Sequence, residues 1–98
     1  MAELLSTKVK TLNIAIAVTG TAIPLSSNTD PINDVLISAP STNTGIIYIG
    51  ASSVTNTAGA AGNGYRLESG KDISIPAKQL SDLYINGTAG DYVSVIAV

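Results

Sequence analysis

The side chains that most often carry enzyme chemistry are missing from this 98-residue sequence, which contains neither histidine nor cysteine. Without histidine, no Ser-His-Asp or Cys-His catalytic arrangement can form, and zinc, copper and haem sites lose their usual nitrogen ligand. Without cysteine, there is no disulfide, zinc ribbon or thiol nucleophile. The groups that remain for chemistry are seven carboxylates, five basic side chains, four tyrosines and the Ser and Thr hydroxyls.

Two groups of acidic or amide side chains could form a calcium site or a glycosidase pair. The candidate calcium ligands are Asp30, Asn33 and Asp34, and the candidate glycosidase carboxylates are Glu68, Asp72 and Asp82. Pro31 and the absence of a distal Glu do not fit a calcium-binding EF-hand loop. The glycosidase group lacks the aromatic platform that a sugar needs. We interpret all six residues as turn, capping or solvated residues and predict no metal, no cofactor and no enzymatic activity.

Two glycine motifs resemble nucleotide-binding loops only in part. The segment Gly62–Leu67 begins like a dinucleotide fingerprint, but leucine stands where the third glycine belongs, and no helical pattern follows. Gly70-Lys71 resembles the end of a phosphate-binding loop, but the next residue is aspartate instead of the Ser or Thr that holds magnesium. The first motif is better explained as a flexible surface loop, and the second is rejected.

The tyrosines and one Asn-Gly-Thr sequence are the other candidates for contact with a ligand. Tyr48 and Tyr84 lie within strand-like patterns, so we expect them to pack on a sheet. Tyr65 flanks a Gly/Ala loop and is the best candidate for an exposed contact. The Asn-Gly-Thr at 86–88 is a formal N-glycosylation acceptor, but the sequence shows no secretory signal, so we interpret it as a turn.

The charge balance points to protein partners. Only 12% of residues are charged and the net charge is −2, with the basic residues scattered or at most paired, so we predict no nucleic-acid binding. The longest apolar run, Ile14–Val18, is far too short for a membrane span, which predicts a soluble protein made inside the cell. A surface so poor in charge is prone to associate, and we expect a homo-oligomer or a subunit of a larger assembly.

The elements that position these residues are predicted to be strands. The sequence has nineteen Ile and Val against eight Leu, and ten Thr, and such β-branched side chains pack well on pleated sheets. Alternating or apolar segments bounded by turn residues predict seven strands and a short eighth. The seven are Val9–Thr19, Thr21–Leu25, Asp34–Ala39, Ile46–Ile49, Asp72–Pro76, Asp82–Asn86 and Tyr92–Val98, and the eighth is Ser53–Thr57.

This spacing of strands and turns predicts an all-β protein with one antiparallel β-sandwich or jelly roll. Pro24 confines its strand to a sheet edge, and the doubly apolar Ile46–Ile49 is expected to be central. Ala77–Ser81 is predicted to form a single helical turn. Residues 1–6 show no alternation and are interpreted as a flexible N-terminal arm, which leaves 7–98 as the sandwich domain.

Four segments in order resemble small structural proteins of tailed bacteriophage virions. They are Gly20–Ser26 (Gly-Thr-Ala-Ile-Pro-Leu-Ser), Asn43–Gly50 (Asn-Thr-Gly-Ile-Ile-Tyr-Ile-Gly), Gly64–Gly70 (Gly-Tyr-Arg-Leu-Glu-Ser-Gly), and Leu83–Asp91 followed by Val93-Ser94-Val95. The third segment has Ser69 where proline is usual in that family. The resemblance spans Gly20 to Val98 and rests on the ordered set of segments.

The resemblance implies a capsid decoration, or cement, protein on the outer surface of the virion. Such proteins are often trimers, and they clamp neighbouring subunits of the major capsid protein. The alternative that the resemblance leaves open is a head-fibre, tail or baseplate module that binds host-surface carbohydrate. We expect the interface to include Leu4 and Leu5 of the N-terminal arm, together with Tyr65 and Arg66.

Overall fold

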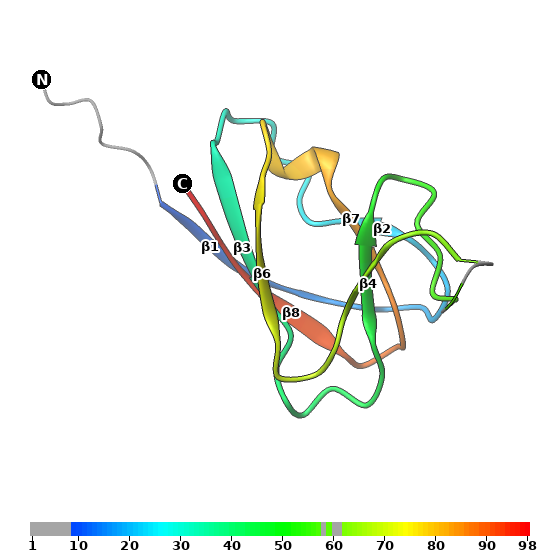
Figure 1. Ribbon diagram of the computed structural model, residues 1–98. Helices are drawn as coiled ribbons and strands as arrows, with labels where there is room; N and C mark the ends of the chain where they lie inside the picture. The colour runs from blue at the N-terminus through cyan, green and yellow to red at the C-terminus, as the bar shows by residue number, and fades with distance from the viewer. Residues whose placement is uncertain (1–8, 58, 60–61) are drawn as a thin grey trace, which may run out of the picture.

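The computed structural model describes residues 9–57, 59 and 62–98. These residues form eight strands and one 3₁₀ turn (Figure 1). The elements are β1 (Lys10–Ala15), β2 (Ile23–Pro24), β3 (Asp34–Ser38), β4 (Ile47–Gly50), β5 (Tyr65–Leu67), β6 (Asp72–Pro76), η3 (Leu80–Asp82), β7 (Tyr84–Asn86) and β8 (Tyr92–Ala97). Within this part of the chain, there is no helix with the length and apolarity needed to cross a bilayer.

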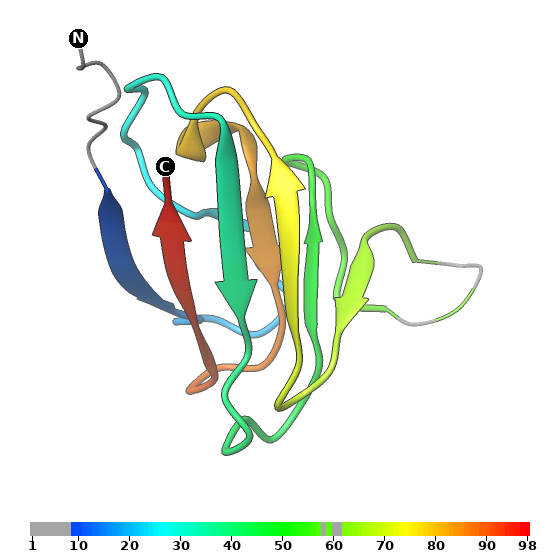
Figure 2. The same cartoon turned by 60° about the vertical axis from the view of Figure 1, so that its left-hand side comes forward.

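The strands form two antiparallel four-stranded sheets that face each other. Sheet A has the order β1-β8-β3-β6 and sheet B the order β2-β7-β4-β5 (Figures 1 and 2). The first strand pairs with the last, the second with the seventh, the third with the sixth and the fourth with the fifth. This nested pairing is the jelly-roll arrangement. The all-β prediction is therefore confirmed, and the topology decides between the two architectures that the sequence left open.

Period-two alternation places one side of each strand of sheet A in the core. In β3, Val35 and Ile37 are buried, while Leu36 between them points to solvent. In β8, Val93 and Val95 are buried in the same way. The core between the sheets consists of Ile16, Leu25, Ile32, Val35, Ile37, Ala39, Ile47, Ile49, Leu67, Leu80, Ile85, Val93, Val95 and Ala97.

Two positional predictions are confirmed and two boundaries need correction. The strand containing Pro24 is an edge strand, and β4 lies between β7 and β5. The first strand ends at Ala15, well before Thr19. The carbonyl of Ile16 accepts the N–H of Gly90 instead of that of Asp91, its neighbour in register, and a turn closed from the Thr21 N–H to the carbonyl of Val18 follows. The predicted helical turn is a 3₁₀ turn shifted to Leu80–Asp82.

The predicted strand Ser53–Thr57 is wrong. The chain turns after β4, with the Val54 N–H donating to the carbonyl of Ala51, and no ladder forms there. Val54 of this segment is nevertheless buried, because its side chain packs against the outer face of sheet B. Asn86 ends β7, as the predicted strand Asp82–Asn86 requires, and the turn that follows is closed from the Asp91 N–H to the carbonyl of Thr88.

Candidate functional site: the outer face of sheet A

The outer face of sheet A is built from side chains that lie in register across four strands. One row runs across β1, β8, β3 and β6 and consists of Thr11, Ile96, Leu36 and Ser74. The next row consists of Asn13, Ser94, Ser38 and Asp72. In Figure 2 the four strands stand side by side, and no described segment crosses in front of them.

Two large aliphatic side chains lie next to each other in the middle of this face. Leu36 on β3 is 37% exposed, and its register partner Ile96 on β8 is 40% exposed. Both occupy the interior strands of the sheet, where side chains on the solvent side are ordinarily polar. A hollow of about 430 Å³ lies over the same strands and is lined by Thr11, Leu12, Asn13, Leu36, Ser38, Ser94, Val95 and Ile96. A surface with exposed aliphatic groups and no charge at its centre favours contact with another protein.

Charge is confined to the margins of this face. Among the strand residues that point outward, only Asp34 and Asp72 are charged, and they begin β3 and β6 at opposite ends of the sheet. Lys10 is the one basic residue of β1. It pairs with the buried Ala97, so its side chain leaves the strand on the side of the sheet that faces the core. The face therefore has no basic group among its described strand residues.

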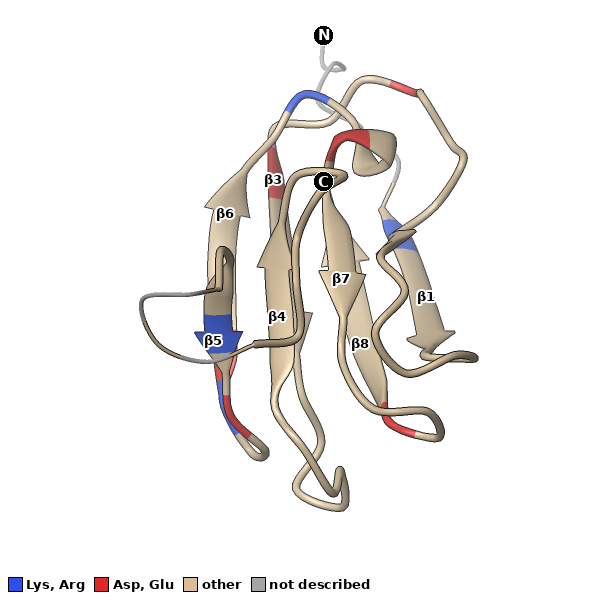
Figure 3. Cartoon of the chain, turned by 90° about the vertical axis from the view of Figure 1, so that its right-hand side faces the viewer, with Lys and Arg blue, Asp and Glu red and all other residues tan. Residues whose placement is uncertain are grey.

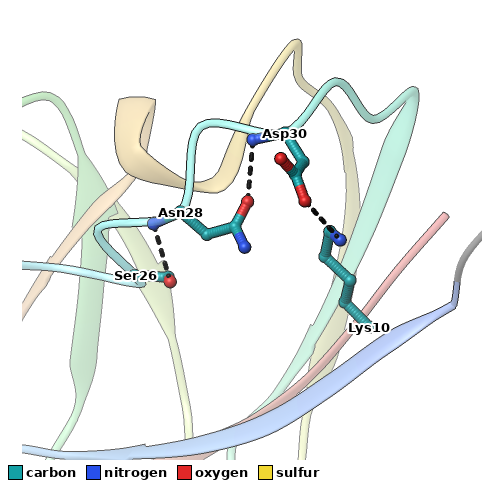
Figure 4. Close-up of polar contacts among 4 residues, drawn as sticks. All are labelled: Lys10, Ser26, Asn28 and Asp30. Carbon is teal, nitrogen blue, oxygen red and sulfur yellow. Dashed lines mark hydrogen bonds and ion pairs between the residues drawn. The ribbon is translucent and has the colours of Figure 1, made fainter.

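Lys10 is held away from the outer face by the loop that leads to β3. Its Nζ lies 3.1 Å from Oδ2 of Asp30 (Figure 4). The loop is shaped by two short-range bonds, from the Asn28 N–H to Oγ of Ser26 and from the Asp30 N–H to Oδ1 of Asn28. These side-chain turns present the Asp30 carboxylate to Lys10, and they leave the neighbouring sheet surface free of that charge.

The outer face of sheet B is covered by the chain itself. After β4 the chain turns back over the sheet (Figure 3), and Val54 packs so close to Gly50 and Gly64 that a side chain at either glycine would meet it. Tyr48, whose neighbours in register are Asn86 and Arg66, is buried beneath this cover. The two sheets thus differ, with one outer face covered and the other open.

Asn86 holds the cover in place. It is only 2% exposed, and its Nδ2 donates to the carbonyl of Val54 at 2.9 Å, while its Oδ1 accepts the N–H of Gly87. The Asn-Gly-Thr sequence at 86–88 is therefore a buried strand end in the folded protein, and its amide is not accessible for glycosylation.

The predicted contact residues Tyr65 and Arg66 lie away from the outer face of sheet A. They belong to β5, the edge strand of sheet B, and Tyr65 is 57% exposed. Arg66 is also exposed, and its Nη2 lies 3.6 Å from the Glu68 carboxylate. A polar hollow of about 330 Å³ adjoins them, lined by Tyr65, Arg66, Leu67, Glu68, Lys71 and Asp72. The other two predicted contacts, Leu4 and Leu5, lie outside the described residues.

The three candidate glycosidase carboxylates do not form one site, although Glu68 and Asp72 line the same polar hollow. Asp72 begins β6, whereas Asp82 lies in η3 beyond the far end of that strand. In the part of the chain that the structure describes, no three His, Cys, Asp or Glu side chains cluster as metal ligands do. Of the candidate calcium ligands, Asp30 is engaged by Lys10, and the Asn33 N–H bonds the carbonyl of Val98.

The most constrained carboxylate is Asp91, which sequence reasoning did not single out. It is 4% exposed and accepts the N–H groups of Thr44 and Gly45 at 2.9 Å each, and the Thr44 hydroxyl at 3.1 Å. Burial by itself raises the pKa of Asp91, but the three hydrogen bonds together outweigh it and lower the pKa below its ordinary value. Asp91 therefore remains ionised and fastens the loop before β4 to the start of β8.

Comparison with known proteins adds no relative. Searches with protein-family models, curated proteins and solved structures found no match.

Proposed function

We propose that the chain is a structural virion protein of a tailed bacteriophage, which decorates the outer capsid shell and stabilises it by binding major capsid subunits. The observation that carries this proposal is the open outer face of sheet A, which has Leu36 and Ile96 at its centre and charged strand residues only at its margins. Such a surface gains free energy when it is removed from water, at roughly 25 cal/mol per Å² of apolar area. It presents no charged side chain at its centre that binding would have to desolvate.

The resemblance to virion proteins falls on residues that fix the fold. Asn43 exchanges two hydrogen bonds with the backbone of Tyr92, and Asp91 binds the backbone of Thr44 and Gly45. Ser69, which stands where proline is usual in that family, donates to the carbonyl of Asn43 at 3.0 Å, so this contact is particular to this chain. Three of the four resembling segments thus meet at one end of the sandwich. This arrangement supports the resemblance as one of structure, and the jelly roll is an architecture also used by viral capsid proteins, by analogy of fold.

The area of the outer face of sheet A indicates whether this face alone could bind the capsid protein stably. Four strands about 4.8 Å apart, with about six residues rising 3.3 Å each, give a surface of roughly 400 Å². Stable protein interfaces bury about 800 Å² per partner. One face is therefore too small to hold the shell alone, which supports a homo-oligomer, with a trimer favoured, and the use of the 1–6 arm with Leu4 and Leu5 as an added contact.

The location test is electron microscopy of the virion that carries this chain. We expect density for the jelly roll on the outer shell, with sheet A against the capsid protein. Leu36→Lys with Ile96→Lys should strongly reduce shell occupancy, because two charges would be buried in the contact. Val18→Lys is the matched control, since Val18 is 59% exposed and lies beyond β1, outside the two rows of this face. Density in the tail or baseplate, or full occupancy by the double variant, would contradict the proposal.

Oligomeric state is tested separately by size-exclusion chromatography with light scattering. We expect a homo-oligomer of three chains at high concentration. A strict monomer under those conditions would refute the homo-oligomer. It would not refute binding to the shell, which the electron microscopy tests.

A second candidate function is a head-fibre, tail or baseplate module that binds host-surface carbohydrate. The exposed ring of Tyr65 beside the polar hollow at β5 favours it, because sugar sites combine an aromatic surface with polar groups. A glycan array would reveal such binding, and Tyr65→Ala should abolish it while Leu36→Ala leaves it intact. Absence of glycan binding by the intact protein would remove this candidate.

A further inference from the structure

The chain contains two Asn-Gly dipeptides, at 63–64 and at 86–87. In this dipeptide the backbone nitrogen of glycine can attack the side-chain amide of the preceding asparagine, because glycine has no Cβ to hinder the approach. Both sites have the same local sequence chemistry, so any difference in their reactivity must come from the fold.

Asn63 lies in the loop between β4 and β5, and its side chain is exposed. Its Oδ1 accepts the N–H of Thr55 at 3.2 Å, whereas its Nδ2 has no hydrogen bond to any described residue. The Thr55 N–H is thus placed to stabilise negative charge that develops on Oδ1 during attack at Cγ. The Nδ2 group, which must leave, is open to water.

The side chain of Asn86, in contrast, is buried and hydrogen-bonded through both Nδ2 and Oδ1. Asn86 ends β7, where it pairs with Tyr48. Its Nδ2 is bound to the carbonyl of Val54 at 2.9 Å, and the Gly87 N–H points at Oδ1 at 2.8 Å. The leaving group is therefore retained, the proton that Gly87 must lose is held in a hydrogen bond to Oδ1, and water is excluded.

We propose that Asn63 is a site of spontaneous deamidation in the folded protein, and that Asn86 is protected from the same reaction. The deprotonated backbone nitrogen of Gly64 attacks Cγ of Asn63 and forms a carbon–nitrogen bond. The bond from Cγ to Nδ2 breaks, and the amide nitrogen takes up a proton and leaves as ammonia. The resulting cyclic imide is opened by one water molecule at either carbonyl, which gives aspartate or isoaspartate. No oxidant, metal or enzyme is needed.

The reaction changes the loop that covers sheet B. Asn63 and Thr55 are linked by backbone and side-chain bonds, including the Asn63 N–H to Oγ1 of Thr55 at 3.1 Å. An isoaspartate lengthens the backbone at this point and breaks that set of bonds. It also adds a negative charge to a chain whose net charge is −2. Deamidation would therefore loosen the cover over Tyr48 and leave the outer face of sheet A unchanged.

The test is peptide mapping by mass spectrometry after incubation of the folded protein in warm, mildly alkaline buffer, which favours loss of the backbone proton. Trypsin separates the two sites, because residues 11–66 form one peptide and residues 79–98 another. We expect Asn63 to convert at least about tenfold faster than Asn86, which corresponds to a barrier difference of about 1.4 kcal/mol. Fragmentation of the first peptide assigns the change to residue 63 among its other asparagines.

Two controls fix the interpretation. In denaturant both dipeptides should convert at similar rates, which shows that the fold and not the sequence separates them. Asn63→Gln should remove the rapid change from the first peptide, since the longer side chain cyclises much more slowly. Equal rates at the two sites in the folded protein, or an Asn63 that converts in denaturant but not in the fold, would overturn the proposal.

Discussion

The Asp91 carboxylate accepts the backbone N–H of Thr44 at 2.9 Å, across 47 positions of the sequence. This bond joins the loop before β4, in sheet B, to the start of β8, in sheet A. Three donors converge on one buried carboxylate, so the link between the sheets depends on the ionised form of Asp91.

Stability is expected to fall in acid because of this carboxylate. The folded-state pKa of Asp91 is lowered, so its contribution is fully present above the unfolded pKa of about 3.9 and is lost as pH falls through the lower folded value. Asp91→Asn should lower the free energy of unfolding by about 1.5–3 kcal/mol at neutral pH and flatten the acid limb. Urea denaturation across pH measures both effects. Asp72→Asn, at an exposed carboxylate, serves as the control and should leave the free energy of unfolding at neutral pH close to the wild-type value.

Two neighbouring residues of β3 should separate binding from stability. Ile37 is fully buried and Leu36 is on the open face. Ile37→Ala should reduce the free energy of unfolding by about 2–5 kcal/mol, because it leaves a cavity in the core. Leu36→Ala should reduce it by less than about 1 kcal/mol and still weaken shell binding. Denaturation curves and particle occupancy are the two measurements, and a large loss of stability in the Leu36 variant would contradict the assignment.

Two glycines with positive φ allow the packing of Val54 against Gly64 to be measured separately from backbone strain. A Cβ at Gly64 (φ +132°) would lie 2.5 Å from Cγ2 of Val54, whereas a Cβ at Gly90 (φ +96°) would meet nothing within 4 Å. Both alanine variants strain the backbone, but Gly64→Ala should be the more destabilising by about 1–3 kcal/mol. Val54→Ala in that background should recover part of the loss, measured as a double-mutant cycle. Equal destabilisation by both alanines would show that the Val54 contact contributes nothing.

Removal of residues 1–6 should weaken capsid occupancy while the jelly roll stays folded. The arm carries Leu4 and Leu5, whose burial against a neighbour would outweigh the entropy of ordering a short segment. Binding of the truncated and full chains to the same particles, compared at several concentrations, measures the effect. Leu4→Ser with Leu5→Ser should reproduce it without shortening the chain, and unchanged binding by both variants would refute a role for the arm.

The fold class could be predicted because the sequence alternates where only one side of a strand is buried. Tyr92–Val98 is an example, in which Val93, Val95 and Ala97 were expected on one side and are buried there. The prediction failed at Ser53–Thr57, where a β-branched run suggested a strand. Val54 is buried from outside the sheet, and no local pattern distinguishes that mode of burial from pairing in a ladder.

The candidate site was harder to predict than the fold. The signal was present, since Leu36 and Ile96 are aliphatic residues on the solvent phase of their strands. Their importance depends on register, because β3 and β8 are far apart in sequence and only the sheet brings these side chains together. The hydrogen bonds to Asp91 could not be predicted from the sequence either, because two of the three donors are backbone N–H groups of a loop that is distant in the chain.

The position of β8 inside sheet A determines when the open face forms during folding. β8 comes last among the described strands, yet it lies between β1 and β3 and carries Ile96. Because β1 pairs with β8 alone, β1 has no partner in the sheet until β8 has formed, and the two halves of the surface row are not joined. The row of Thr11, Ile96, Leu36 and Ser74 is therefore completed in one step, when β8 pairs with both of its neighbours.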